Sequence, residues 1–446
     1  MKKKNIIWIF SDQQPGYSLS CNGDPNVRTP NLDRMAGDGF NFRRAVSGFP
    51  LCCPFRGSLL TGLYPHECVP GHEYRMPPEL PTAADFFNAA GYDTAYFGKW
   101  HLDGCRNKID IDRTVFWNIP KERRGRFQTF LGYDNNNMQY DCYVHGHRRD
   151  EEVPLYRLPG YETDDLSDLL IDYLDTRRAP DQPFFAVLSV QPPHNPYIAP
   201  PENLRHYQPQ SLKLRPNVAH NPTVESKVRL DLAGMYGMIE NIDDNVGRIL
   251  ASVRRNNLEE DTWIFYFSDH GDMHGSHGLF KKTNPYQESI GIPFVVWNGC
   301  CHHYTDHYVE TENPYPLNHV DILPTSLGLA GLEVPADLPG FDYSPVMLRK
   351  PIENPPRAAY LQNVVPTKHC DSFDRPYRGV LTLDNWKYVC SEESDIYLFD
   401  LNTDPYEEMN LAFNTRYRVK RAELRQLTAD FVAATRDDFQ MPEFKD

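Results

Sequence analysis

One short segment combines a cysteine, a proline and an arginine at close spacing. Cys52, Pro54 and Arg56 lie in the segment 51–62. Pro54 suits the first turn of a helix and Gly62 its end, so we predict a helix that opens at Pro54, with Cys52 just before it. The helix dipole and the Arg56 guanidinium would both favour negative charge there. The segment indicates a cysteine nucleophile of lowered pKa or an anion-binding site, and the alternative is a buried structural cysteine.

Polar side chains also follow four apolar runs at the point where each run ends. The carboxyl ends of parallel strands meet at one edge of a sheet, so we expect these side chains to converge. Each has an ordinary explanation when taken singly, such as a helix cap or a structural histidine. Their coincidence at four strand ends indicates a functional site. The residues are Asp12 and Gln13, then Lys99 and His101, then His194, and finally Asp269 and His270.

Four of these residues suit a divalent metal ion. Asp12, Gln13, Asp269 and His270 offer three oxygen ligands and one imidazole. Oxygen ligands favour Ca²⁺ or Mg²⁺, whereas the imidazole moves the balance toward Mn²⁺ or another transition ion. We predict one bound metal, with Ca²⁺ as the expected ion and Mn²⁺ or Mg²⁺ as alternatives. The competing explanation is that Asp269 merely begins a turn in the run 269–278.

A mostly parallel sheet is needed to bring these residues together. Short runs rich in β-branched and aromatic residues alternate with helical patterns, which predicts an α/β fold with helices on both faces of the sheet. Residues 103–160 show weak periodicity, and we predict a long excursion over the active face. The expected strands are 5–10, 94–97, 184–190, 262–267 and 294–297, and the expected helices are 30–36, 81–90, 164–173 and 229–253.

The pattern changes near residue 345. Four short apolar runs with tight connections, at 360–364, 379–383, 386–390 and 396–400, predict an antiparallel group, and a helix is expected near 419–435. We therefore predict a catalytic domain over residues 1–345 and a small α+β subdomain over residues 346–446.

Composition limits the classes of partner. The 46 basic and 61 acidic side chains give a formal charge of −15, which argues against a nucleic-acid partner. No run approaches the roughly 18 apolar residues of a membrane span. The run 6–10 after the N-terminal lysines is too short for a signal peptide and predicts a buried strand. Ten cysteines without a regular framework indicate reduced thiols, so we expect a cytoplasmic protein.

The string Cys52-x-Pro54-x-Arg56 with Leu60-Thr61-Gly62 resembles the signature of the type I sulfatases. The resemblance covers nearly the whole chain and implies an alkaline-phosphatase-like α/β fold with a small C-terminal subdomain. It implies hydrolysis of a sulfate monoester, carried by a small molecule or an oligosaccharide, with carbohydrate and aryl or steroid sulfates both open. Further matching segments are 6–13, 28–33, 98–102, 193–194, 268–271, 278–282, 286–289, 320–325 and 397–405.

The same resemblance implies roles for the candidate residues. A formylglycine-forming maturation enzyme would oxidise Cys52, and the hydrated aldehyde would attack sulfur. Asp269 would be a metal ligand and also accept a proton from this diol. Arg56 and His101 would orient the formylglycine, Lys99 and Lys282 would neutralise sulfate charge, and His194 would protonate the leaving oxygen, with Lys281 as a rival to Lys282.

Three residues depart from the common family pattern. Phe55 replaces a small residue, Gln13 replaces the second metal aspartate, and His270 replaces an asparagine. A Gln–His metal site also resembles that of the phosphonate monoester hydrolases, whereas Lys99 and His101 favour the sulfatases. The alternatives are therefore a phosphonate or phosphodiester hydrolase with the same nucleophile, and a catalytically silent anion-binding homologue.

Substrate specificity is expected in residues 103–160 and 196–202. Phe130, Tyr133 and Tyr140, with the asparagines of 135–137, could contact a sugar or aryl ring. Packing and turn formation are the alternative roles for the same residues.

Overall fold

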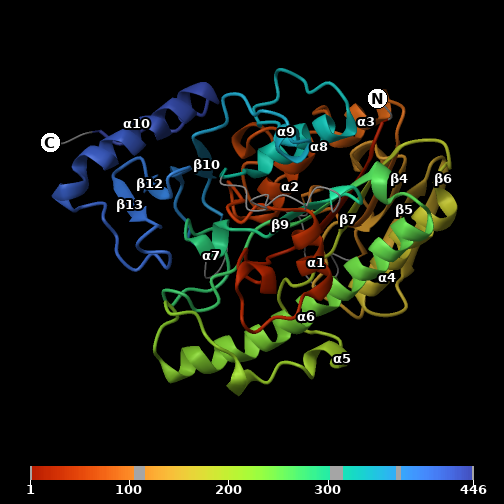
Figure 1. Ribbon diagram of the computed structural model, residues 1–446, viewed down its shortest axis with the longest axis horizontal. Helices are drawn as coiled ribbons and strands as arrows, with labels where there is room; N and C mark the ends of the chain where they lie inside the picture. The colour runs from red at the N-terminus through yellow and green to blue at the C-terminus, as the bar shows by residue number, and fades with distance from the viewer. Residues whose placement is uncertain (1–2, 105–115, 302–314, 368–372, 444–446) are drawn as a thin grey trace.

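A nine-stranded sheet forms the centre of the protein in the computed structural model, which describes residues 3–104, 116–301, 315–367 and 373–443 (Figure 1). The strand order is β2-β9-β8-β1-β7-β3-β4-β5-β6. The strands are β1 (Asn5–Ser11), β2 (Phe40–Asn41), β3 (Asp93–Lys99), β4 (Thr129–Tyr133), β5 (Tyr143–Arg148), β6 (Glu151–Arg157), β7 (Phe184–Ser189), β8 (Thr262–Ser268) and β9 (Phe294–Trp297).

The middle of this sheet is parallel and its two sides are antiparallel. Strands β8, β1, β7, β3 and β4 run in the same direction. On one side, β9 pairs antiparallel with β8, and β2 pairs antiparallel with β9. On the other side, β5 pairs antiparallel with β4, and β6 pairs antiparallel with β5. The predicted mostly parallel α/β fold is confirmed. The antiparallel direction of β9 relative to β8 was not predictable, because a run of apolar residues is the same in a parallel and in an antiparallel strand.

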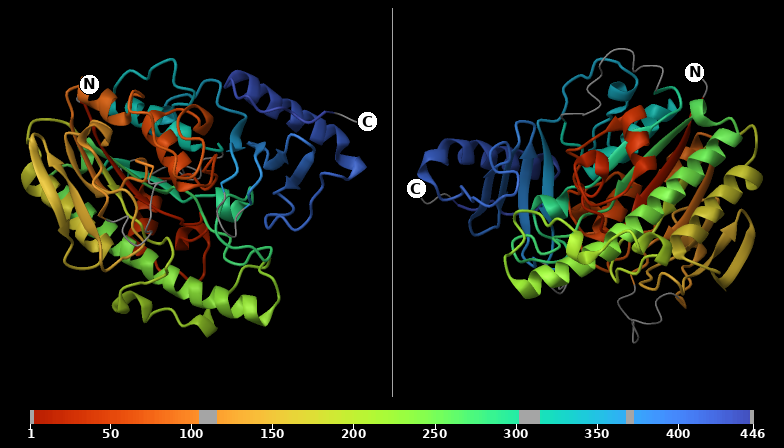
Figure 2. Two further views of the ribbon diagram at one scale, coloured as in Figure 1. Left: turned by 180° about the vertical axis from the view of Figure 1, so that it is seen from behind. Right: turned by 60° about the horizontal axis from the view of Figure 1, so that its bottom comes forward.

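Alternate residues of β1 face the two helical layers that cover the sheet (Figure 2). Trp8 and Phe10 belong to a core shared with α2, α3 and α8, whereas Ile7 and Ile9 belong to a core shared with α1, α4 and α6. Burial on both faces explains why the central strands are continuously apolar. The main helices here are α1 (Pro30–Asp38), α2 (Cys52–Thr61), α3 (Ala83–Ala89), α4 (Glu162–Asp172), α6 (Pro222–Arg255) and α8 (Ile322–Ala330).

The expected long excursion over residues 103–160 contains three strands that the sequence analysis did not predict. Strand β4 pairs parallel with β3, and the β5–β6 hairpin extends the edge of the main sheet. The sequence did not indicate β5 as a buried strand because two of its buried residues, His145 and His147, are polar. Hydrogen bonds to their rings make this burial possible. Residues 105–115 lie outside the described part.

The C-terminal part forms a second, antiparallel sheet, as predicted. Its order is β10 (Ala358–Asn363), β11 (Tyr377–Thr382), β12 (Trp386–Cys390) and β13 (Asp395–Asp400). Helix α10 (Arg418–Ala434) packs on it, and both lie at one end of the molecule (Figure 1). Residue 345 lies within the short α9 (Ser344–Met347). The division into two domains at that residue stays a prediction.

Two further expectations concern cysteines and membranes. The eight cysteines within the described residues are free, and Cys105 and Cys370 lie outside them. Among the described helices, none combines the length and apolar character needed to cross a membrane.

Candidate active site

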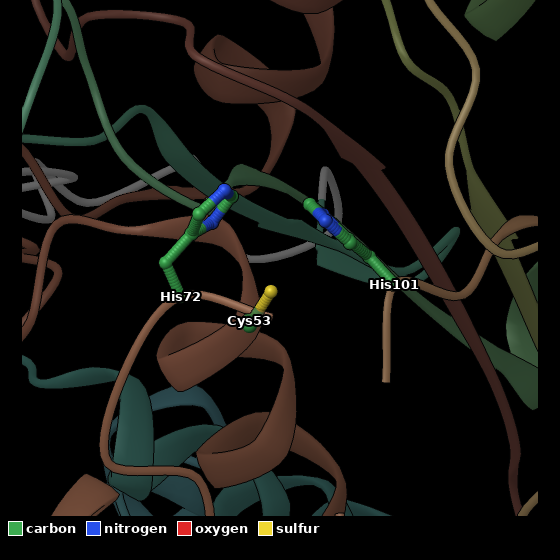
Figure 3. Close-up of side chains that lie close together, drawn as sticks. All are labelled: Cys53, His72 and His101. Atoms are coloured by element: carbon green, nitrogen blue, oxygen red, sulfur yellow. The ribbon is translucent and has the colours of Figure 1, made fainter. Parts of the chain in front are cut away.

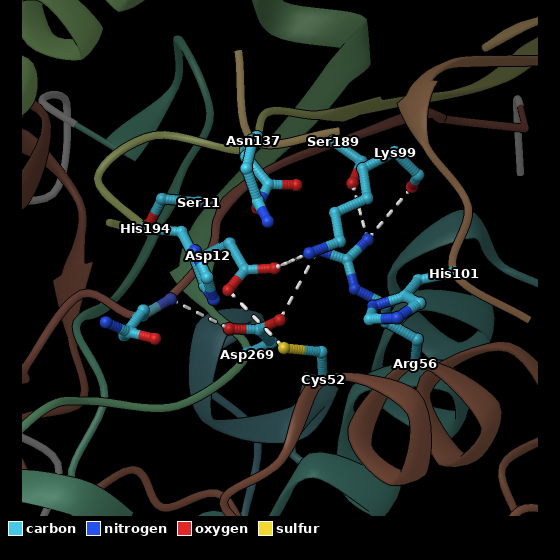
Figure 4. Close-up of polar contacts among 12 residues, drawn as sticks. Ser11, Asp12, Cys52, Arg56, Lys99, His101, Asn137, Ser189, His194 and Asp269 are labelled. Carbon is cyan, nitrogen blue, oxygen red and sulfur yellow. Dashed lines mark hydrogen bonds and ion pairs between the residues drawn. The ribbon is translucent and has the colours of Figure 1, made fainter. Parts of the chain in front are cut away.

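The first turn of α2 meets the loops that follow β1 and β8 (Figure 4). It also meets the segment that precedes β9, which carries Lys282. The sulfur of Cys52 is 98% buried and lies 3.5 Å from Asp12 Oδ1 and 3.2 Å from His270 Nε2. Lys282 Nζ lies 3.3 Å from the same sulfur. A cysteine, a carboxylate, an imidazole and an ammonium therefore converge on one point at the carboxyl edge of the sheet.

Helix α2 begins at Cys52, two residues before the predicted start at Pro54. Leu51 precedes the helix and supplies no side-chain cap, so Cys52 occupies the first helical position. Burial and the Asp12 carboxylate raise the pKa of the Cys52 thiol to about 11, although Lys282 and Lys99 oppose this shift. The hypothesis of a cysteine with a lowered pKa is therefore wrong, because burial of the thiol, together with the Asp12 carboxylate, outweighs the two cations.

Arg56 projects from the next turn of α2 and joins the ends of four strands, β1, β8, β3 and β7. Its Nη2 donates to Asp12 Oδ2 at 3.0 Å and to Asp269 Oδ2 at 3.3 Å. Its Nη1 donates to Lys99 O at 2.9 Å and to Ser189 Oγ at 2.7 Å. Figure 4 shows the guanidinium between these two sets of acceptors. This arginine fixes the two carboxylates relative to Cys52.

The predicted metal ligands lie together. One donor atom each from Asp12, Asp269, His270 and Cys52 lies within 4.8 Å of the others. His270 Nδ1 lies 2.9 Å from Gly271 O, so the ring's Nε2 is left to accept or to bind a metal. These donors fit a divalent cation.

Gln13 completes the ligand set through a fixed amide. Its Nε2 donates to Asp272 Oδ2 at 2.6 Å, and its Oε1 accepts from Lys282 Nζ at 3.0 Å. The Asp272 carboxylate thus sets the amide orientation and points the carbonyl oxygen toward the Cys52 side. An oxygen ligand is what Ca²⁺ prefers, so the amide also fits the predicted ion.

His194 and Lys282 form a pair beside Cys52. His194 Nε2 lies 3.0 Å from Lys282 Nζ, and His194 Nδ1 lies 2.7 Å from Asn195 O. Burial and the Lys282 ammonium hold the pKa of His194 well below its usual value. Between the two rival lysines, it is the Lys282 side chain that contacts Cys52, whereas the neighbouring Lys281 binds Asp272 through its backbone N–H.

Lys99 and His101 leave the end of β3 in different directions. Lys99 Nζ donates to Asp12 Oδ2 at 2.7 Å and so joins the site. His101 Nε2 lies 3.1 Å from Glu73 Oε1, and its Nδ1 has no hydrogen-bond partner in the described part of the chain. His101 is therefore close to the site but makes no hydrogen bond to Cys52, and its proposed role in orienting that residue stays a prediction.

The sequence analysis missed two supporting residues. Ser189 ends β7 and accepts from Arg56, so the strand-end rule that selected Asp12 would have found it. Asp272 accepts from both Gln13 and Tyr197, at 2.6 Å and 3.0 Å. Its place in the loop after β8 was visible, but its bond to an amide from β1 depends on the fold.

Comparison with protein families gives two matches. The sulfatase family model matches residues 4–332. A model described as N-sulphoglucosamine sulphohydrolase, C-terminal, matches residues 275–433. Together they span the site and both sheets.

Two relatives match along almost their whole length. An ulvan-active sulfatase of Formosa agariphila is 33% identical over 99% of this chain and 83% of its own. An endo-4-O-sulfatase of Bacteroides thetaiotaomicron is 31% identical over 93% of this chain and 89% of its own.

Solved structures agree with this assignment. A structure described in work on glycosaminoglycan metabolism by Bacteroides thetaiotaomicron has a TM-score of 0.85 and 26% identity, and covers 98% of this chain and 97% of its own. The phosphonate monoester hydrolase of Agrobacterium radiobacter has a TM-score of 0.76 at 21% identity over 97% and 96% of the two chains, which shows a shared fold alone. The chain belongs to the sulfatase family of alkaline-phosphatase-like fold and is a sulfuric ester hydrolase.

Proposed function

We propose that this protein hydrolyses a sulfate monoester of a carbohydrate, using formylglycine made from Cys52 and one divalent metal. The observation that carries the proposal is the surrounding of Cys52, whose sulfur lies within 3.5 Å of Asp12, His270 and Lys282. A side chain at this position would face metal ligands on one side and a cation on the other. That arrangement suits a nucleophile which attacks an anionic ester.

The unmodified thiol is poorly suited to be that nucleophile. The pKa of Cys52 is raised to about 11 by burial and by Asp12, so the thiol stays protonated near neutral pH. Oxidation by a maturation enzyme would replace the thiol with an aldehyde, whose hydrate supplies a hydroxyl nucleophile. This chemistry removes the need for a thiolate beside Asp12.

The metal would be held by Asp12, Gln13, Asp269 and His270. When bound, a divalent ion such as Ca²⁺ would act as a Lewis acid toward a sulfate oxygen. The chain's own part is to orient these ligands, through the guanidinium of Arg56 on Asp12 and Asp269. The two carboxylates would otherwise repel each other in a buried site.

Charge in the site favours an anion. The carboxylates of Asp12 and Asp269 face three buried cations, Arg56, Lys99 and Lys282. Preorganised cations in a water-poor site stabilise charge that develops during the reaction. His194 lies on the Lys282 side, 3.0 Å from that ammonium, and is the candidate for protonating the leaving oxygen. This role requires the charge of a bound sulfate to raise the pKa that burial and Lys282 hold low.

Carbohydrate is the substrate class that the relatives support, because one relative is named for ulvan and the other as an endo-4-O-sulfatase. Near the site, Gln139 Nε2 donates to Pro196 O at 3.1 Å, which ties the segment before Tyr140 to the loop after His194. The Tyr140 ring is 42% exposed and is available to a sugar face. Phe130 and Tyr133 are fully buried, so they pack in the core instead.

Co-expression with a formylglycine-forming enzyme tests the proposal. Mass spectrometry of the peptide containing Cys52 should show conversion of the thiol to the aldehyde. The matured protein should then release sulfate from sulfated oligosaccharides, and Tyr140→Ala should raise KM for them more than it lowers kcat. Absence of the aldehyde in active protein would sink the nucleophile, and a marked preference for aryl sulfates would sink the carbohydrate assignment.

A phosphonate monoester hydrolase is the second candidate. It is favoured by one observation, the presence of Gln13 and His270 at the metal site in place of the commoner family residues. An aryl phosphonate assayed beside an aryl sulfate separates the two activities.

A further inference from the structure

We propose that Cys53, His72 and His101 form a second metal site, for a thiophilic ion such as Zn²⁺, beside the proposed catalytic cysteine. Figure 3 shows the Cys53 thiol pointing toward the space between the two imidazole rings. The site uses none of the ligands proposed for the first metal. The inference does not depend on the proposed substrate, but it gives His101 a different role from the orientation of formylglycine that the family resemblance implies.

The three donor atoms are already close to binding positions. One sulfur and two ring nitrogens lie within 4.8 Å of one another. Zinc bonds of about 2.3 Å to sulfur and about 2.0–2.1 Å to nitrogen, at tetrahedral angles, place ligand atoms roughly 3.4–3.6 Å apart. The donors of any pair would therefore have to approach each other by about 1.4 Å at most, which small side-chain rotations allow.

The burial and the backbone conformation of His101 support a metal ion bound next to this residue. The residue is 97% buried, and its Nδ1 has no hydrogen-bond partner in the described residues. A buried polar atom without a partner is costly and requires an explanation. His101 also has a φ of 54°, in the left-handed region that residues other than glycine seldom adopt. Strained residues of this kind gather at functional sites.

Glu73 supplies the outer support that metal-binding histidines usually have. Its Oε1 lies 3.1 Å from His101 Nε2 and 3.7 Å from His72 Nε2. A carboxylate on one ring nitrogen fixes the ring and makes the other nitrogen a better ligand. The backbone N–H of Glu73 also donates to Cys53 Sγ at 3.4 Å, which opposes the burial that raises the pKa of this thiol.

The donor types distinguish this site from the first one. A thiolate with two imidazoles selects Zn²⁺ or Cu⁺, whereas the oxygen-rich set around Asp12 selects Ca²⁺ or Mg²⁺. The His72 side chain is 30% exposed, which gives an ion a route to the two buried ligands. Cys53 lies in α2, His72 lies after the short helix Pro65–Glu67, and His101 lies after β3, so a bound ion would join three segments around the active site.

Metal titration of the Cys52→Ala protein tests the proposal, because this variant removes the thiol that belongs to the donor cluster of the first site. With Ca²⁺ in saturating excess, Co²⁺ should bind at one equivalent and give a thiolate-to-cobalt charge-transfer band, and Zn²⁺ should displace it and raise Tm. Adding Cys53→Ser should abolish the band and weaken Zn²⁺ binding by more than the roughly 10–100-fold caused by loss of an outer-shell partner.

Two further variants make the test specific. Adding Cys68→Ser, at a buried thiol outside the cluster, should leave the band and the affinity unchanged. Adding His72→Ala, at the partly exposed ligand, should weaken binding without unfolding the protein. The proposal is overturned if Co²⁺ gives no thiolate band in the folded Cys52→Ala protein, or if the band survives Cys53→Ser.

Discussion

Replacement of Arg56 by alanine should destabilise the metal-free protein by about 3–5 kcal/mol, the usual cost of breaking a buried ion pair. The side chain is 99% buried and donates to Asp12 at 3.0 Å and to Asp269 at 3.3 Å. Its loss leaves two carboxylates in a dry site with less compensating charge. Two neutral acceptors, Lys99 O and Ser189 Oγ, also lose the N–H that Arg56 donates, although the Tyr96 hydroxyl still donates to Lys99 O.

A second buried arginine provides the matched control. Arg378 donates through Nε and Nη2 to Asp437 at 2.6 Å and 2.8 Å, in the C-terminal sheet. Arg378→Ala should therefore cost a similar 3–5 kcal/mol. The two variants should differ in their response to Ca²⁺, because only Arg56 contacts the carboxylates proposed to bind the ion.

Urea unfolding with and without Ca²⁺ is the assay. Ca²⁺ should recover more of the lost free energy of unfolding in Arg56→Ala than in Arg378→Ala, since the ion replaces positive charge beside Asp12 and Asp269. A loss below about 1 kcal/mol in Arg56→Ala would refute the reasoning about the buried pair. Equal recovery in both variants would refute the placement of the metal.

Three other predictions follow from the same geometry. Lys282→Ala should lower kcat by about 10²–10³-fold because its ammonium contacts Cys52, whereas Lys281→Ala should change it only a few-fold, and steady-state kinetics of both variants checks this. Chelation should inactivate the enzyme and Ca²⁺ should restore it; full turnover in protein shown to be metal-free would contradict the metal site. Burial raises the pKa of Glu162 from 4.5 to about 7, although Tyr133 and Gln191 donate to it. The unfolded chain ionises this group first, so raising the pH from 4.5 past 7 should cost the native state up to about 3 kcal/mol. Glu162→Gln should therefore gain stability relative to the parent between pH 5 and pH 8, and thermal melts that show no such pH trend would contradict the shift.

The sequence predicted the elements whose pattern is local. The apolar runs of β1, β3, β7 and β8 marked the buried strands. The rule that ligands gather at their carboxyl ends predicted that Asp12, Lys99 and Asp269 lie together, as they do in the structure. The rule works because a parallel sheet brings all such ends to one edge.

The remaining features depend on contacts between distant segments. The histidines of β5 made that strand look like a loop, because the partners of their ring nitrogens come from another segment: Ile119 for His145, and Arg124 and Phe127 for His147. The raised pKa of Cys52 depends on burial by the fold and on the carboxylate of Asp12, forty residues away. The cluster of Cys53, His72 and His101 has no regular spacing, so no motif revealed it.

The most direct test of the account is a comparison of rates. The matured protein would be assayed on an aryl sulfate and on the matching aryl phosphonate, with Cys52→Ala as the control. The account predicts faster cleavage of the sulfate and loss of that activity in Cys52→Ala. Faster cleavage of the phosphonate, or turnover of the sulfate that survives Cys52→Ala, would contradict it.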